Sequence, residues 1–146
     1  MPDTKVKQEW RPAITAFICG WCAAGAADLA GDSHLTYPAD VRIVQVPCVG
    51  RINPLLIARA LQKGADGVLV IGCHPCDCHF QTGNLVRRRT VAVLKKYLAY
   101  LGIDGARVQI AWVSASEGTR FAAIVNQAVA DIGALGPQQQ LVEKVV

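Results

Sequence analysis

All six cysteines of this chain lie just after an apolar stretch of sequence. The densest group spans residues 72–79 and reads Gly-Cys-His-Pro-Cys-Asp-Cys-His, with three thiols and two imidazoles in one turn. The remaining cysteines form a Cys-x-x-Cys pair at residues 19–22 and a single site at residue 48. Thiolates and imidazoles are the ligands that soft and borderline metals prefer. The pattern therefore predicts a metal or redox site.

Three chemistries fit such a set of thiols. An iron–sulfur cluster needs four ligands, usually cysteine thiolates, and structural zinc needs the same ligand types in a tetrahedron. A redox dithiol needs one Cys-x-x-Cys at a helix start, which suits Cys19 and Cys22 but leaves the other cysteines unexplained. Zinc is disfavoured because the chain has enough apolar residues to fold without a metal. The residues favour a cluster and leave the dithiol and zinc as alternatives.

Length and composition are typical of one compact domain. The chain has 146 residues, of which 52% are hydrophobic and 18% charged, with a net charge of +4. No apolar run approaches the roughly 20 residues that span a bilayer, and the polar first ten residues do not resemble a signal peptide. We therefore expect a cytoplasmic protein without membrane insertion. Residues 87–89 form the one dense basic run, and no aromatic ladder accompanies it, so a nucleic-acid partner is not expected.

Strands and helices should alternate along the chain. The apolar stretches predict strands, and Ala-rich or amphipathic stretches with helix-start and helix-stop residues predict helices. We expect strands over residues 13–18, 41–46, 67–71 and 107–113. We expect helices over residues 22–30, 54–63 and 83–101, and a fourth after the capping-box sequence Ser114-Ala115-Ser116-Glu117.

This alternation predicts the α/β class, with a mainly parallel four-stranded sheet between helices on both faces. The first and third strands are the most apolar and should be central, which gives the strand order 2-1-3-4. Ligands in such sheets bind beyond the carboxyl ends of the strands, where the winding direction reverses. Cys19, Cys22, Cys73 and Cys78 should converge there, with Cys48 one strand away. We expect an extension over residues 1–12, the α/β domain over 13–134 and a tail over 135–146.

Several motifs together resemble a known family. They are Phe17-Ile18-Cys19-Gly20-Trp21-Cys22-Ala23-Ala24-Gly25-Ala26-Ala27-Asp28, Val46-Pro47-Cys48-Val49-Gly50-Arg51-Ile52, Gly64-Ala65-Asp66-Gly67-Val68, Gly72-Cys73-His74-Pro75 with Asp77-Cys78-His79, and Gly83-Asn84. They are similar to the delta subunit of the methyl-viologen-reducing hydrogenase. The resemblance runs from about residue 17 to 121.

The resemblance implies one 2Fe–2S cluster and the transfer of single electrons. Its motif cysteines match Cys19, Cys22, Cys48, Cys73 and Cys78, of which four would be ligands. The family usually has glycine where this chain has Cys76, so that thiol ranks lower. The implied partners are a hydrogenase or formate dehydrogenase donor and a heterodisulfide reductase-like subunit with flavin and iron–sulfur centres. The chain would be an electron-transfer subunit with no turnover of its own.

Residues near the thiols are candidates for contacts around a cluster or with a partner. They are Trp21, His74, His79, Arg87, Arg88 and Arg89. With enough thiols present, hydrogen bonding to the site is a better expectation for the histidines than ligation, although Rieske centres use two histidines. The arginines should lie in the first turn of a helix, where the helix dipole disfavours cations. We therefore expect at least one of these arginines to contact an acidic partner surface or to lie near the cluster as a cation.

Overall fold

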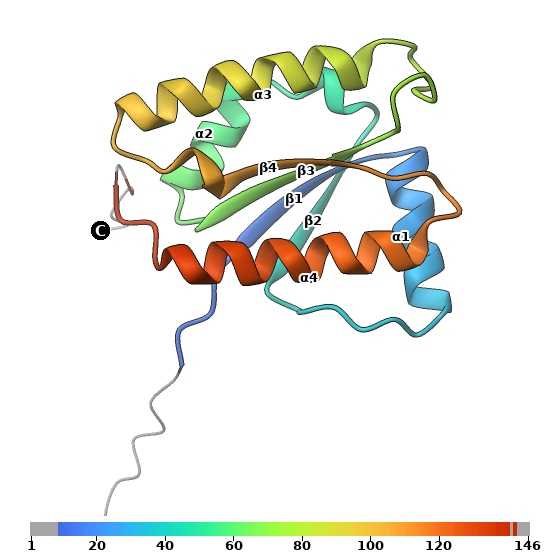
Figure 1. The fold of residues 1–146 in the computed structure, drawn as a ribbon, viewed down its shortest axis with the longest axis horizontal. Helices are drawn as coiled ribbons and strands as arrows, with labels where there is room; N and C mark the ends of the chain where they lie inside the picture. The colour runs from blue at the N-terminus through green and yellow to red at the C-terminus, as the bar shows by residue number, and fades with distance from the viewer. Residues whose placement is uncertain (1–8, 141, 143–146) are drawn as a thin grey trace, which may run out of the picture.

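A parallel sheet lies between two layers of helices (Figure 1). The computed structural model describes residues 9–140 and 142. The strands are β1 (Ile14–Cys19), β2 (Val41–Val46), β3 (Gly67–Gly72) and β4 (Val108–Trp112), in the order β2-β1-β3-β4. The predicted class and strand order are confirmed.

Apolar content decided the place of each strand in the sheet. β3 is buried along its whole length, and β1 is buried except at Thr15. β2 is largely exposed and pairs with β1 alone among the described strands, with Ile14 opposite Val41. Val68 pairs with Val108 at the other edge. A strand covered on both faces needs a continuous apolar run, and these runs were visible in the sequence.

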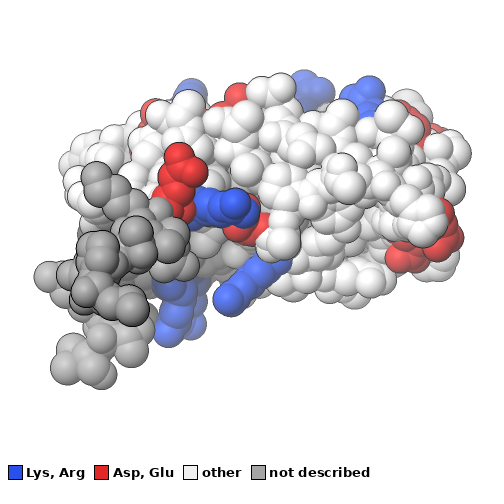
Figure 2. Space-filling view, turned by 90° about the horizontal axis from the view of Figure 1, so that it is seen from below, with Lys and Arg blue, Asp and Glu red and all other residues white. Residues whose placement is uncertain are grey.

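The helices cover the two faces in pairs (Figure 1). α1 (Cys22–Asp32) and α4 (Gly118–Leu135) lie on one face, and α2 (Pro54–Gln62) and α3 (Gly83–Tyr100) lie on the other. Two short 3-10 turns, η1 (Val49–Arg51) and η2 (Gly105–Arg107), join them to the strands. Figure 2 shows that most of the surface seen from below is uncharged, with acidic side chains towards both of its ends.

Local sequence explains both boundaries of α2. The Asn53 side chain accepts a hydrogen bond from the Leu55 N–H at 2.9 Å, and Pro54 is the first residue of α2. After that helix Gly64 adopts a φ of +108°, which glycine reaches without steric cost. The Ser114 capping box forms only in part: Glu117 accepts from the Ser114 N–H, but α4 begins at Gly118. Ser114 instead turns its hydroxyl to Ser116.

A polar clamp holds the edge of the sheet where the strands begin. The buried Asp66 carboxylate accepts from the N–H groups of Ala13, at 2.8 Å, and Gln138, at 2.9 Å. The buried Arg107 donates to the carbonyls of Asp66 and Gly136, both at 2.9 Å. These bonds fix the segment that follows α4 against the sheet. Most of the apolar ending at residues 141–146 lies outside the described residues.

No helix within the described part of the chain is both long and apolar enough to cross a membrane.

Candidate metal centre

The cysteines gather at the edge of the sheet where the strands end. Cys19 is the last residue of β1, Cys22 the first of α1, and Cys48 directly precedes η1. Cys73 and Cys78 lie in the loop between β3 and α3. We call these five cysteines the thiol edge. None of them is in a disulfide, and all are buried except Cys22, which is half-buried.

Three thiols form the first part of the thiol edge. The Sγ atoms of Cys19 and Cys73 are 3.5 Å apart, and the Cys22 thiol is close enough to affect the pKa of Cys73. The backbone N–H of Ala23 donates to the Cys19 sulfur at 3.2 Å, from the first turn of α1. Burial and the two neighbouring thiols together raise the pKa of Cys73 far above its usual value. Such crowding favours an added cation that would let these thiols ionise.

Cys48 and Cys78 form the second part. Cys78 is the thiol that acts most strongly on the pKa of Cys48, and the Gly50 N–H donates to the Cys48 sulfur at 3.4 Å. Burial raises the pKa of Cys48. Burial acts in the same direction on Cys78, but hydrogen bonds from the backbone around the start of α3, chiefly from Asn84, outweigh it and lower the pKa of that thiol. The start of α3 therefore stabilises negative charge at Cys78.

Two glycines allow η1 and the start of α3 to come into contact beside Cys48 and Cys78. A side chain at Gly83 would collide with the Cys48 sulfur and lie 3.5 Å from that of Cys78. A Cβ at Gly50 would come 2.6 Å from the Gly83 Cα, closer than Cβ atoms approach other atoms. η1 and the start of α3 can therefore touch only because both residues lack a side chain. No sequence pattern indicated this contact, since the two glycines are far apart in the chain.

Cys76 stays apart from the other thiols. It is exposed, in the same loop as Cys73 and Cys78, with a φ of +71°. A non-glycine residue in this conformation is uncommon, which fits the expectation that glycine is usual at this place. The structure brings together the other five cysteines and leaves Cys76 at the surface of the loop.

Aromatic side chains border the thiol edge. Trp21 stacks on His79 with ring centroids 3.8 Å apart, and His79 meets Phe80 edge-to-face at 5.0 Å. Trp21 and Phe80 remain 52% and 50% exposed, so their outer faces are open to solvent or to a partner. Beside them lies a groove of about 600 Å³. It is lined by Pro47, Cys48, Gly50, Arg51, Phe80, Thr82, Gly83 and Val86.

The three arginines have different environments. Because α3 begins at Gly83, they lie in its second turn rather than the first. Arg87 is buried and donates to backbone carbonyls of residues 49, 50 and 52, in and just after η1. Arg88 and Arg89 are exposed. A direct partner contact is therefore open to Arg88 and Arg89, and Arg87 faces the protein interior.

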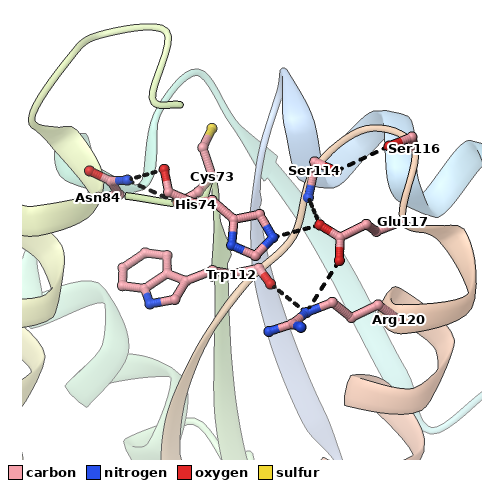
Figure 3. A network of polar contacts seen from close by, with 8 residues as sticks. All are labelled: Cys73, His74, Asn84, Trp112, Ser114, Ser116, Glu117 and Arg120. Atoms are coloured by element: carbon pink, nitrogen blue, oxygen red, sulfur yellow. Dashed lines mark hydrogen bonds and ion pairs between the residues drawn. The ribbon is translucent and has the colours of Figure 1, made fainter. Parts of the chain in front are cut away.

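A polar network next to Cys73 was not foreseen (Figure 3). The His74 Nε2 lies 2.5 Å from the Glu117 carboxylate, which also accepts from the Ser114 N–H at 3.1 Å and pairs with Arg120 at 3.6 Å. Hydrogen bonds from His74 and Ser114 lower the pKa of Glu117. The network holds the His74 ring against Glu117, a residue distant in sequence.

The buried Asn84 amide holds the other side of the same loop (Figure 3). It donates to the carbonyls of Cys73, at 2.9 Å, and His74, at 2.8 Å. This links the end of β3 to the start of α3. Both parts of the thiol edge are thereby attached to the same helix.

Within the described residues, no three His, Cys, Asp or Glu side chains are arranged to hold a single metal ion. The thiols instead lie as a group of three beside a group of two. Their charges interact across the gap, since a charged Cys19 raises the pKa of Cys48.

Fold and site together define an α/β protein of the doubly wound kind, whose ligand-binding edge is lined by cysteines. A family model described as "Methyl-viologen-reducing hydrogenase, delta subunit" matches residues 14–136. The chain belongs to this family, as its motifs indicated.

Curated relatives agree with this assignment. An iron–sulfur subunit of the F420-non-reducing hydrogenase of Archaeoglobus profundus is 46% identical over 132 residues, which are 90% of this chain and 96% of that protein. The vhc iron–sulfur subunit of the same kind of hydrogenase from Methanococcus voltae is 45% identical over 130 residues, covering 89% and 90% of the two chains.

A third relative is much longer. It belongs to the ferredoxin/F(420)H(2)-dependent CoB-CoM heterodisulfide reductase of Methanosarcina acetivorans and is 40% identical over 126 residues. These are 86% of this chain but 16% of that protein. A domain similar to this chain is therefore part of a larger reductase polypeptide there.

Proposed function

We propose that this protein is an electron-transfer subunit that binds one 2Fe–2S cluster on the thiol edge. The observation that carries the proposal is the arrangement of five thiols as three beside two. A cluster of this type has two irons, and each needs two protein ligands. Cys48 and Cys78 would serve one iron, and two of the three thiols Cys19, Cys22 and Cys73 would serve the other.

Backbone groups around the sulfurs support the same proposal. N–H groups point at Cys19, Cys48 and Cys78, from α1, η1 and the start of α3. Hydrogen bonds to sulfur and burial set the reduction potential of protein-bound clusters. The glycine contact leaves room for sulfur where a side chain would fill it. The donor set therefore fits an iron–sulfur cluster.

Bound there, the cluster would take up and release one electron at a time. The protein's own part is to hold the thiolates, to limit water around them and to present one edge to redox partners. Trp21 and Phe80 stand at that edge with exposed rings. We place the partner contact on this aromatic side, because electron transfer needs the two centres close together.

The relatives' names support a hydrogenase and a heterodisulfide reductase as the kinds of partner. We propose that one partner is a hydrogenase or formate dehydrogenase and that the other is a heterodisulfide reductase-like subunit with flavin and iron–sulfur centres. The long Methanosarcina relative supports the second, because a domain like this one is part of the reductase polypeptide itself.

Anaerobic purification with metal analysis tests the proposal. We expect two irons and two acid-labile sulfides per chain, visible absorbance, and an EPR signal of one unpaired spin after reduction. A colourless protein that reduces disulfides through Cys19 and Cys22 would instead establish the dithiol alternative. One zinc per chain with no sulfide would establish the zinc module.

A further inference from the structure

Arg87 is a buried cation held by the loop that carries Cys48. Its side chain is 3% exposed. Its Nε donates to the Val49 carbonyl at 2.7 Å, and its Nη2 donates to the carbonyls of Gly50, at 3.2 Å, and Ile52. The carbonyls of this loop thus surround one side of the guanidinium. Arginine is always charged in proteins, so a full positive charge lies beneath the thiol edge.

The remaining nitrogen of Arg87 lacks a partner. Its Nη1 is buried and donates no hydrogen bond within the described part of the chain. Leaving a buried donor of a charged group unpaired costs more than leaving a neutral one, and native structures rarely do so without a reason. An unpaired donor on a buried cation indicates the place of an acceptor that carries negative charge.

The candidate acceptors on this side of the molecule are the thiols, which carry negative charge once they ligate a metal. Burial lowers the pKa of Arg87, and a charged Cys48 acts in the opposite direction, so the two groups are close enough to interact. No carboxylate in the described residues is hydrogen-bonded to Arg87. Arg88 and Arg89 are exposed, where water and salt screen their charges.

We propose that Arg87 is the internal counter-cation of the thiol edge, with Nη1 donating to a sulfur on the Cys48 side of the bound cluster. The inference rests on the proposed function and extends it. One-electron reduction adds one negative charge to the site and breaks no bond. A fixed cation beside the site stabilises the reduced form, so Arg87 raises the reduction potential. Arg87 acts as a positioning residue: it holds the η1 loop in place and keeps a positive charge beside the site.

Charge and hydrogen bonding can be separated by substitution. Arg87→Lys keeps the charge and loses the fork of donors, and Arg87→Met removes both at similar length. We expect both variants to be less stable than the wild type to thermal unfolding, because the loop carbonyls lose their donors. We expect the midpoint potential, from a redox titration followed by EPR, to fall furthest in Arg87→Met, which loses both the charge and the hydrogen bond to sulfur, and to fall less in Arg87→Lys, which keeps the charge.

Arg88→Met and Arg89→Met are the matched controls, one and two positions along the same helix. Each should leave the midpoint potential unchanged. Equal potentials in Arg87→Met and the wild type would overturn the proposal, and so would an equal fall in all three methionine variants.

A measurement on the wild type removes the dependence on variant folding. Protein labelled with ¹⁵N in its arginines should show a weak nitrogen coupling to the reduced cluster in pulsed EPR. The coupling should persist in Arg88→Lys and disappear in Arg87→Lys. A wild-type cluster without any arginine coupling would overturn the role of Arg87 and leave the proposed function intact. A wild type without iron and sulfide would overturn the proposed function itself.

Discussion

Individual thiols on the thiol edge are not equivalent. Cys78 is the thiol that acts most strongly on the pKa of Cys48, whereas both Cys19 and Cys22 act on the pKa of Cys73. In the proposed cluster, a ligand lost from the group of three has a neighbouring thiol able to replace it. The group of two, Cys48 and Cys78, has no third thiol that could replace a lost one.

Serine substitution should reveal this difference. We expect Cys48→Ser and Cys78→Ser to lose most of the bound iron, at least a tenfold decrease in cluster occupancy after purification. At least one of Cys19→Ser, Cys22→Ser and Cys73→Ser should keep a cluster with altered EPR g-values. Cys76→Ser is the control and should match the wild type in iron, sulfide and spectrum. Loss of the cluster in Cys76→Ser would assign that thiol as a ligand.

A second prediction for a single residue concerns Glu117, whose contribution to the stability of the fold should depend on pH. Its pKa in the folded protein is lowered below its ordinary value of 4.5, first by the hydrogen bond from His74. Its contribution to stability is therefore complete above the pKa of the unfolded chain and is lost as the pH falls through the lower folded pKa.

We therefore expect Glu117→Gln to be less stable than the wild type near neutral pH. The difference in the free energy of unfolding should shrink as the solution is acidified through the folded pKa. Urea unfolding of both proteins, reduced and free of metal, at a series of pH values measures this difference. A difference that is constant with pH would show that the Glu117 charge has no role in the network.

At the scale of elements, α3 and η1 meet through two glycines and one arginine. A Cβ at Gly83 would collide with the Cys48 sulfur. At Gly31, inside α1, a Cβ would meet nothing within 4 Å. The same substitution should thus have opposite effects at the two positions.

We expect Gly83→Ala to destabilise the protein by about 1–3 kcal/mol through overpacking and to displace Cys48. Gly31→Ala should stabilise it by about 0.5–1 kcal/mol, because alanine is the better helix former. Urea unfolding measures both values, and iron content reports whether Cys48 has moved. A neutral Gly83→Ala variant with full iron content would contradict the close contact between η1 and α3.

Most of the order of elements was predictable from sequence, and long-range contacts were not. The buried strands β1 and β3 are continuous apolar runs, and the caps of α2 are local, so pattern alone placed them. The convergence of Cys19 and Cys73 followed from the topology, which placed Cys48 one strand away. The burial of Arg87 did not, since a run of three arginines normally indicates a solvated face. The His74 pair with Glu117 joins residues whose proximity only the packed sheet creates.

For the whole molecule, the clamp around Asp66 matters most to the edge opposite the thiols. The carboxylate receives N–H groups from the start of β1 and from the segment after α4. Three distant parts of the chain therefore depend on one buried side chain. Removing it would leave two donors without a partner.

We expect Asp66→Ala to lower the free energy of unfolding by about 1–3 kcal/mol and to release the segment after α4. Limited proteolysis should then cut after residue 135, where the wild type resists. Asp104→Ala is the control, because that exposed carboxylate accepts one N–H, from Ala106 at 2.9 Å, just before β4 begins. An equal decrease in the free energy of unfolding in the two variants would show that the burial of Asp66 adds nothing to its contribution.

The clamp also decides where added sequence can be attached. Residues 9–13 and 136–140 both lie at the edge where the strands begin, across the molecule from the cysteines (Figure 1). A purification tag or a fused domain that reaches the described part of the chain from that side would leave the exposed rings of Trp21 and Phe80 uncovered. The protein is therefore suited to immobilisation on an electrode through such a tag, with the thiol edge directed toward solution.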